Sequence, residues 1–135
     1  KNISDKPLVL VLWIAPITSL ITSSIVYATA LGVEINMNFV MPLFMGALFI
    51  LIGNYLPKCK QNYSVGIKVS WTLNSEENWN HTHRFSGVLW VIGGILIMAT
   101  AFLETYMIMI GALICMTILP FVYSYLYYAK HEKQD

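Results

Sequence analysis

Charged residues are scarce in this sequence of 135 residues, and its long apolar runs contain none. Only 11% of the residues are charged, whereas 57% are hydrophobic. A water-soluble domain of this length lacks the interior to bury so much apolar surface, and the helices of a soluble bundle need a polar face that these runs do not have. The composition therefore excludes a soluble helical bundle and predicts an integral membrane protein.

Cysteine is almost absent, which excludes a disulfide framework. Cys59 stands between two lysines, and Cys115 stands deep inside an apolar run. We expect these two positions to lie in different environments, so that no structural disulfide joins them. An exposed, unreactive thiol is the expected state of Cys59.

Four apolar runs are long enough to cross a hydrocarbon core of about 30 Å, which takes about 20 helical residues. We predict membrane-spanning helices over about residues 8–31, 37–56, 86–103 and 106–128. The links 32–36 and 104–105 are short, so each pair of helices forms an antiparallel hairpin. The predicted fold is an all-α integral membrane protein with a four-helix transmembrane bundle. It is a single membrane domain (1–135) whose loop 57–85 contains a short helix.

Small residues and proline within the runs indicate how these helices pack. Pro120 removes one backbone hydrogen bond of its helix, so a neighbouring helix or a hydroxyl must satisfy the freed carbonyl. Small residues that allow close helix approach are Gly46, Gly53, Gly93, Gly94, Gly111, Ala112 and Cys115. None of them forms a Gly-x-x-x-Gly pair, so the sequence signal for a dimer is weak.

Positive charge is confined to one side of the predicted bundle. All eight lysine and arginine residues lie before residue 8, in the loop 57–85 or after residue 128, and the short links carry only Glu34 and Glu104. By the positive-inside rule, the termini and the loop are cytoplasmic and the protein is a multi-pass membrane protein. Because no ionisable residue lies within a span, a pump or ion-coupled transporter is disfavoured.

The loop 57–85 is the only long polar passage, and we expect it to contain one extended and one helical part. Residues 66–73 are rich in β-branched and aromatic types, which favours an extended segment. Ser75 is a candidate N-cap for a short helix that ends near Arg84. Trp79 on this helix is expected to anchor it at the level of the lipid headgroups.

The titratable side chains of the short helix are candidates for metal binding or acid–base catalysis. His81 and His83 lie two residues apart and point to nearly opposite sides of a helix, so no metal site is predicted. We expect these histidines to be exposed or paired with a local carboxylate. A membrane enzyme or lipid-headgroup-binding protein using Glu76, Glu77, His83 and Arg84 is the alternative function, although no nucleophile accompanies them. No cofactor is predicted.

A longer motif extends from the end of the second span through the loop. It comprises Gly53-Asn54-Tyr55-Leu56-Pro57-Lys58, Asn62-Tyr63, Gly66-Ile67-Lys68, Trp71-Thr72-Leu73, Ser75-Glu76-Glu77, Trp79 and Thr82-His83-Arg84-Phe85. Over about residues 39–128 the chain resembles the SdpI family of bacterial membrane proteins. The sequence departs at Lys68-Val69-Ser70, where that family more often has Arg-Thr-Pro. Because Lys does not make the bidentate contacts of Arg, the resemblance does not assign an anion-binding role to Lys68.

This resemblance implies a non-enzymatic immunity and signalling protein of the bacterial cell membrane. Such a protein confers resistance to a secreted antimicrobial peptide and holds a cytoplasmic transcriptional repressor at the membrane. The implied partners are the lipid bilayer, the peptide and the repressor protein, with no direct contact to nucleic acid. Longer members carry two further N-terminal spans, so we interpret the chain as a fragment.

The resemblance also directs attention to particular side chains of the loop. Candidates for binding a partner or ligand are Asn54, Asn62, Lys68, Trp71, Thr72, Glu76, Glu77, Trp79, Thr82, His83 and Arg84. We expect Trp71, Trp79, His83 and Arg84 to shape a rigid surface, while a peptide meets the spans or the outer links. A purely structural loop that caps the helices is an equally good interpretation.

Overall fold

The computed structural model describes residues 5–61, 66–103 and 105–132, and within these ranges the regular elements are all helical. In chain order they are α1 (Asp5–Ala30), α2 (Met37–Tyr55), the 3-10 helix η1 (Leu56–Lys58), α3 (Ser70–Leu73), α4 (Glu76–Leu103), α5 (Met107–Tyr127) and the π-helix η2 (Tyr128–Glu132). Helices α1, α2, α4 and α5 are long and apolar enough to cross a membrane. The predicted class, an all-helical membrane protein with four spans, is confirmed.

Local signals explain where the first hairpin turns. After α1, Gly32 adopts φ +93°, and the amides of Gly32 and Val33 donate to the carbonyls of Thr29 and Ala28. This is the pattern by which a glycine with positive φ closes a helix C-terminus. Helix α2 then begins after Asn36, whose side chain accepts a hydrogen bond from the Asn38 amide at 3.1 Å.

The loop and the third span are less separate than the sequence indicates. Helix α4 runs without interruption through the polar stretch and the apolar stretch, for 28 residues in all. At 1.5 Å per residue it is about 42 Å long, so its polar first turns extend beyond a hydrocarbon core of about 30 Å. The expected extended segment 66–73 is wrong for its second half, because residues 70–73 form α3.

Helices α2 and α4 approach so closely that their backbones touch. Gly46 and Gly53 on α2 face Gly94 and Gly87 on α4. A Cβ on Gly53 would lie 2.8 Å from the Gly87 carbonyl oxygen, and one on Gly94 would lie 2.6 Å from that of Gly46. In each helix the two glycines are seven residues apart, which returns them to the same face after two turns. The role of Gly87 was not predicted.

Helix α5 packs on another face of α4 and depends on it for one hydrogen bond. Pro120 leaves the carbonyl of Met116 without its helical partner, and the indole N–H of Trp90 on α4 donates to that carbonyl at 3.1 Å. This confirms that a neighbouring helix satisfies the freed group. Met116 also packs over Gly93, which has no side chain to obstruct it.

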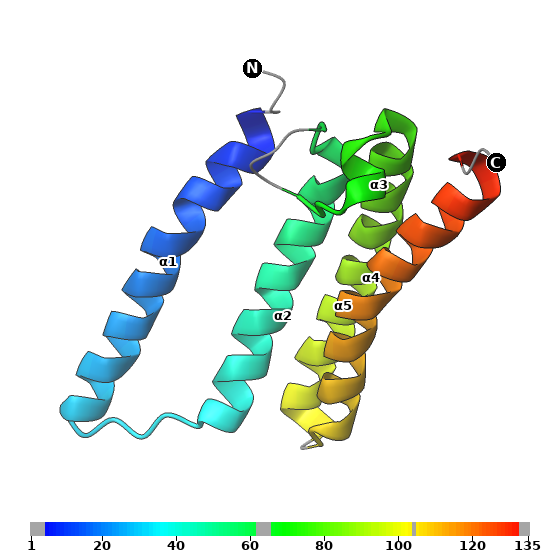
Figure 1. Cartoon of the computed structure of the whole chain (residues 1–135). Helices are drawn as coiled ribbons and strands as arrows, with labels where there is room; N and C mark the ends of the chain where they lie inside the picture. The colour runs from blue at the N-terminus through cyan, green and yellow to red at the C-terminus, as the bar shows by residue number, and fades with distance from the viewer. Residues whose placement is uncertain (1–4, 62–65, 104, 133–135) are drawn as a thin grey trace.

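Helix α1 stands apart from the packed helices, as Figure 1 shows. None of the described side chains of its apolar stretch is buried. The Ser24 hydroxyl donates to the Leu20 carbonyl four residues earlier, as expected for a membrane helix. The packed part therefore consists of α2, α4 and α5. Helix α1 begins and α5 ends at the same end of the molecule as α3 (Figure 1).

We predict that Gly53→Ala destabilises the protein, because the added methyl group meets backbone atoms of α4. The expected loss is about 1–3 kcal/mol of unfolding free energy, typical of overpacking. Thermal unfolding in detergent or nanodiscs measures it as a lowered midpoint. Gly111→Ala is the matched control, because a Cβ there meets nothing within 4 Å and Ala favours a helix. Equal midpoints for both variants would contradict the packing role.

Candidate functional site

The described residues between η1 and α4, 59–61 and 66–75, fold over the first turns of α4; we call them the cap. Figure 1 shows α3 lying beside α4 at the end where α5 finishes. The Ser75 hydroxyl oxygen accepts the Asn78 amide at 3.1 Å, which confirms Ser75 as the N-cap of the helix below. The cap is therefore directly continuous with the helix on which it packs.

His83 on α4 is fully buried beneath the cap. Together with Trp79 it holds the cap against α4, and we call these two residues the clamp. Its Nδ1 lies 2.8 Å from the Trp79 carbonyl oxygen, and its Nε2 lies 3.0 Å from the Ile67 amide nitrogen. Because the carbonyl only accepts and the amide only donates, the ring is neutral with its proton on Nδ1. The expectation that this histidine is exposed or paired with a carboxylate is wrong.

Trp79 forms the second half of this clamp. Its ring stacks on His83 with centroids 4.2 Å apart, and its indole N–H donates to the Cys59 carbonyl at 2.8 Å. Gly66 crosses both rings with φ +128°, and a Cβ there would lie 2.7 Å from atoms of each ring. Trp79 is thus a buried structural residue and not a headgroup anchor, and Cys59 is buried rather than exposed.

Thr72 and Gln61 explain why part of the expected extended segment is helical. The Thr72 hydroxyl lies 2.9 Å from the Ile67 carbonyl oxygen and 3.0 Å from the Val69 amide nitrogen, which closes the start of α3. The side-chain amide of Gln61 donates to the carbonyls of Thr72 and Leu73 at 2.8 and 2.9 Å. These bonds satisfy both ends of a single helical turn, which has no stability of its own.

A buried polar network joins α4 to α5 beneath the cap. The Asn78 side-chain amide donates to the Ser124 carbonyl at 3.1 Å, and its oxygen accepts from the hydroxyls of Thr82 and Ser124 at 2.9 and 3.0 Å. All three side chains are fully buried. Satisfied networks of this kind select one register between helices, because a slipped register leaves polar groups unpaired.

The region just described is also the part of the chain that resembles known proteins. The model of the SdpI/YfhL protein family matches residues 58–124, which include the cap, α4 and most of α5. The chain belongs to this family. It is 27% identical over 131 residues to "Immunity protein SdpI" of Bacillus subtilis (strain 168), a match that covers 95% of this chain. No solved structure matches it.

This SdpI/YfhL chain spans 60% of the length of that relative. The family match and this relative together confirm the family resemblance found in the sequence. The protein is a multi-pass membrane homologue of an immunity protein, and the lipid bilayer surrounds its apolar helices.

Within the family-matched region, the structure divides the predicted partner-binding residues into two groups. Thr72, Trp79, Thr82 and His83 are fully buried, so the expectation that Trp79 and His83 shape a surface is wrong. The exposed members are Lys68, Glu76, Glu77 and Arg84, and Trp71 is half-buried. Asn62 lies outside the described residues.

Asn54 is separate from the other candidates. It is exposed on the last turn of α2 and lines a groove of about 240 Å³ with Gly53, Gly87 and Val91. This groove follows the contact between α2 and α4 and does not include the cap. Asn54 is therefore not part of one site with the exposed charges of α4.

Sequence reasoning missed several residues that hold the cap, or join the helices beneath it, in this SdpI/YfhL protein. Gln61, Asn78 and Ser124 act through hydrogen bonds to distant segments, and the Cys59 contribution is a backbone carbonyl. One signal was present, because Asn78 and Thr82 are four residues apart and share a helix face. Their partner Ser124 lies 46 residues beyond Asn78, and no local pattern connects them.

We predict that His83→Ala loosens the cap, because the Ile67 amide loses its acceptor and Trp79 loses its stacking partner. Hydrogen exchange of the residue 66–73 amides should become about tenfold faster or more, as expected when one buried hydrogen bond is lost. Mass spectrometry of the protein in detergent or nanodiscs measures this. Arg84→Ala, an exposed neighbour, should leave exchange unchanged; equal protection in His83→Ala would rule out the clamp.

Proposed function

We propose that this protein is an immunity and signalling protein that protects a bacterium from a secreted antimicrobial peptide, and that its cap binds a cytoplasmic partner. The observation that carries this proposal is that His83 and Trp79 are buried and hold the cap in a fixed position. Such a cap is built to present a surface. The curated name of the relative, an immunity protein, supports the same function.

The exposed charges on and beside the cap indicate the kind of partner that the cap can bind. Lys68 lies on the cap, and Glu76, Glu77 and Arg84 extend from the first turns of α4, all of them exposed. The Tyr127 hydroxyl donates to Glu77 at 3.3 Å, which ties this face to the end of α5. A face with both signs of charge favours a protein surface of complementary pattern, and we propose a cytoplasmic repressor as that partner.

The alternative function, a membrane enzyme or lipid-headgroup-binding protein, has less support. It requires His83 to converge with Glu76, Glu77 and Arg84 on a substrate. His83 is enclosed by Trp79, Gly66 and Ile67 with both ring nitrogens engaged, whereas the three charged residues point to the exterior. Unchanged membrane lipid composition in His83→Ala and Glu76→Ala cells would remove this alternative.

We predict that expression of the full-length gene raises the survival of sensitive bacteria. The cells are challenged with spent medium of the source organism and, separately, of Bacillus subtilis strain 168, and the dilution that kills half of them is recorded. Cells with the empty vector are the control, and an immunoblot verifies that the protein is in the membrane. Absence of protection with the protein present would reject the proposed immunity function.

We predict that the cap and the α1–α2 link lie on opposite sides of the membrane. In intact cells, Val33→Cys in the link should react with a membrane-impermeant maleimide, because Val33 is exposed. Asn74→Cys in the cap should react only after the cells are permeabilised, since the basic segments flank the cap. The native protein, with Cys59 buried and Cys115 on an apolar helix, is the control. The opposite labelling pattern would invert the proposed orientation.

A further inference from the structure

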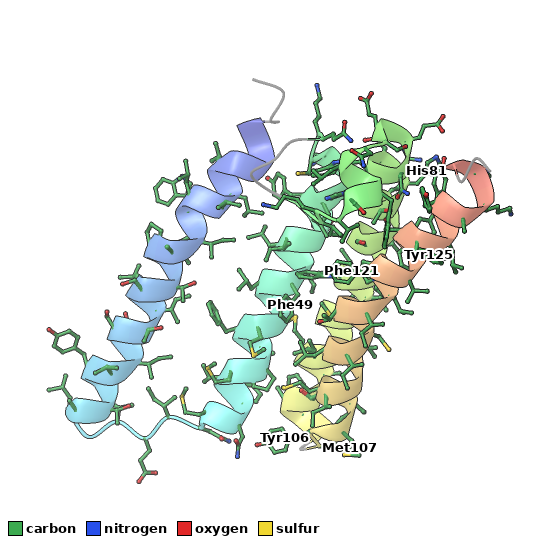
Figure 2. All side chains as sticks on the ribbon, viewed as in Figure 1. Phe49, His81, Tyr106, Met107, Phe121 and Tyr125 are labelled. Carbon is green, nitrogen blue, oxygen red and sulfur yellow. The ribbon has the colours of Figure 1, made fainter. Side chains whose placement is uncertain are left out.

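A second pocket lies at the end of the molecule opposite the cap, where the two short links meet. Figure 2 places Tyr106 and Met107 at this end, far from His81. The pocket has a volume of about 280 Å³ and is lined by Asn36, Asn38 and Phe39 of the first link and α2, and by Ala101, Thr105 and Tyr106 around the second link. It therefore joins the two hairpins of the fold.

Three side-chain oxygens of this pocket, those of Asn36, Asn38 and Thr105, already accept a hydrogen bond. The Asn36 side-chain oxygen accepts from the Asn38 amide at 3.1 Å, and the Asn38 side-chain oxygen accepts from the Tyr106 hydroxyl at 2.7 Å. The Thr105 hydroxyl oxygen accepts from the Met107 amide at 3.4 Å. The bond between Tyr106 and Asn38 also joins the start of α2 to the start of α5, which gives the pocket a defined shape.

Two side-chain donors of the pocket, by contrast, are available. Among the described residues, the side-chain NH₂ groups of Asn36 and Asn38 donate to no protein acceptor. Helices α2 and α5 both begin at this end, and neither has an acidic residue in its first turn. Helices α1 and α4 end at the same place, so the negative ends of their dipoles offset the positive ends of these two.

The charges near the pocket and its apolar wall indicate which kind of ligand the pocket can bind. Residues 7–57 and 85–129 contain no lysine or arginine, and Glu34 is exposed in the first link. An anionic phosphate or carboxylate would thus lack a counter-charge, whereas a neutral carbonyl would not need one. Phe39, in edge-to-face contact with Phe102 at 5.3 Å, and Ala101 supply an apolar wall. A carbonyl beside an apolar side chain is the repeating chemistry of an apolar peptide.

We propose that this pocket binds main-chain carbonyl groups and one apolar side chain of the secreted peptide at the outer face of the membrane. The inference rests on the proposed immunity function and adds a recognition site to it. The cap and the pocket then serve different partners at opposite ends of the same helices.

The test replaces both carboxamides without removing their structural roles. In the double variant Asn36→Asp/Asn38→Asp, each carboxylate keeps an oxygen that accepts from the Asn38 amide or the Tyr106 hydroxyl. Asp is also as good an N-cap as Asn and is favourable in a first turn. The two NH₂ donors are lost, and two negative charges are gained. Val33→Asp adds a negative charge to the same link outside the pocket and is the matched control.

Sensitive cells that express each variant are challenged with the spent media described above. The double variant should require at least about tenfold less peptide for half-killing than the wild type, because a peptide carbonyl would meet an acceptor instead of a donor. Val33→Asp should protect as the wild type does. Membrane abundance and unfolding midpoint are compared for all proteins, and Asn38→Asp alone replaces the double variant if the latter is absent from the membrane.

The outcomes separate this inference from the proposed function. If the wild type protects and the Asp variants protect equally while present in the membrane, the pocket does not bind the peptide. The same holds if mass spectrometry shows a co-purified lipid that the double variant loses without losing protection. If the wild type itself does not protect, the proposed immunity function and this inference both fail.

Discussion

The close backbone contact between α2 and α4 is the constraint on which the rest of the structure depends. At Gly53 and Gly87 the two helices leave no room for a side chain, and Pro57 of η1 packs on Gly87 just beyond them. This contact sets where the chain leaves α2, so that the Cys59 carbonyl lies within reach of the Trp79 indole. A larger residue at the contact would displace η1 and, with it, the first attachment of the cap.

Beyond that attachment, buried polar groups hold each successive segment of the cap in place. Trp79 holds Cys59, His83 holds Ile67, and Thr72 and Gln61 hold the single turn of α3. Each of these groups is costly to bury without a partner, and in this arrangement each has one. The residues that first suggest acid–base chemistry are therefore used to keep the polar end rigid. The two ends of the molecule differ accordingly, with mixed charge around the cap and uncharged hydrogen-bond donors at the other.

Much of the fold was predictable because its causes are local or compositional. Length and hydropathy identify four spans, Gly32 closes α1, Pro120 requires a donor from a neighbour, and Ser75 starts α4. The candidate site was predicted less well. The motif directed attention to His83 and Trp79, but their burial follows from Gly66 and Ile67 folding over them. Propensity favoured an extended segment at 70–73, and hydrogen bonds from Gln61, about ten residues earlier, outweighed it.

The amino-acid sequence by itself determined the membrane class, the number of spans, the separation of charge between the two ends, and the family. These properties follow from apolar runs, from charge positions along the chain, and from a motif, none of which requires knowledge of contacts. Tertiary structure alone decided which polar residues are buried clamps and which are exposed, that Gly87 is a contact point, and that the two short links enclose a pocket. The physical reason is that burial and hydrogen bonding are pairwise. A residue such as Asn78 acquires its role only when α5 brings Ser124 beside it.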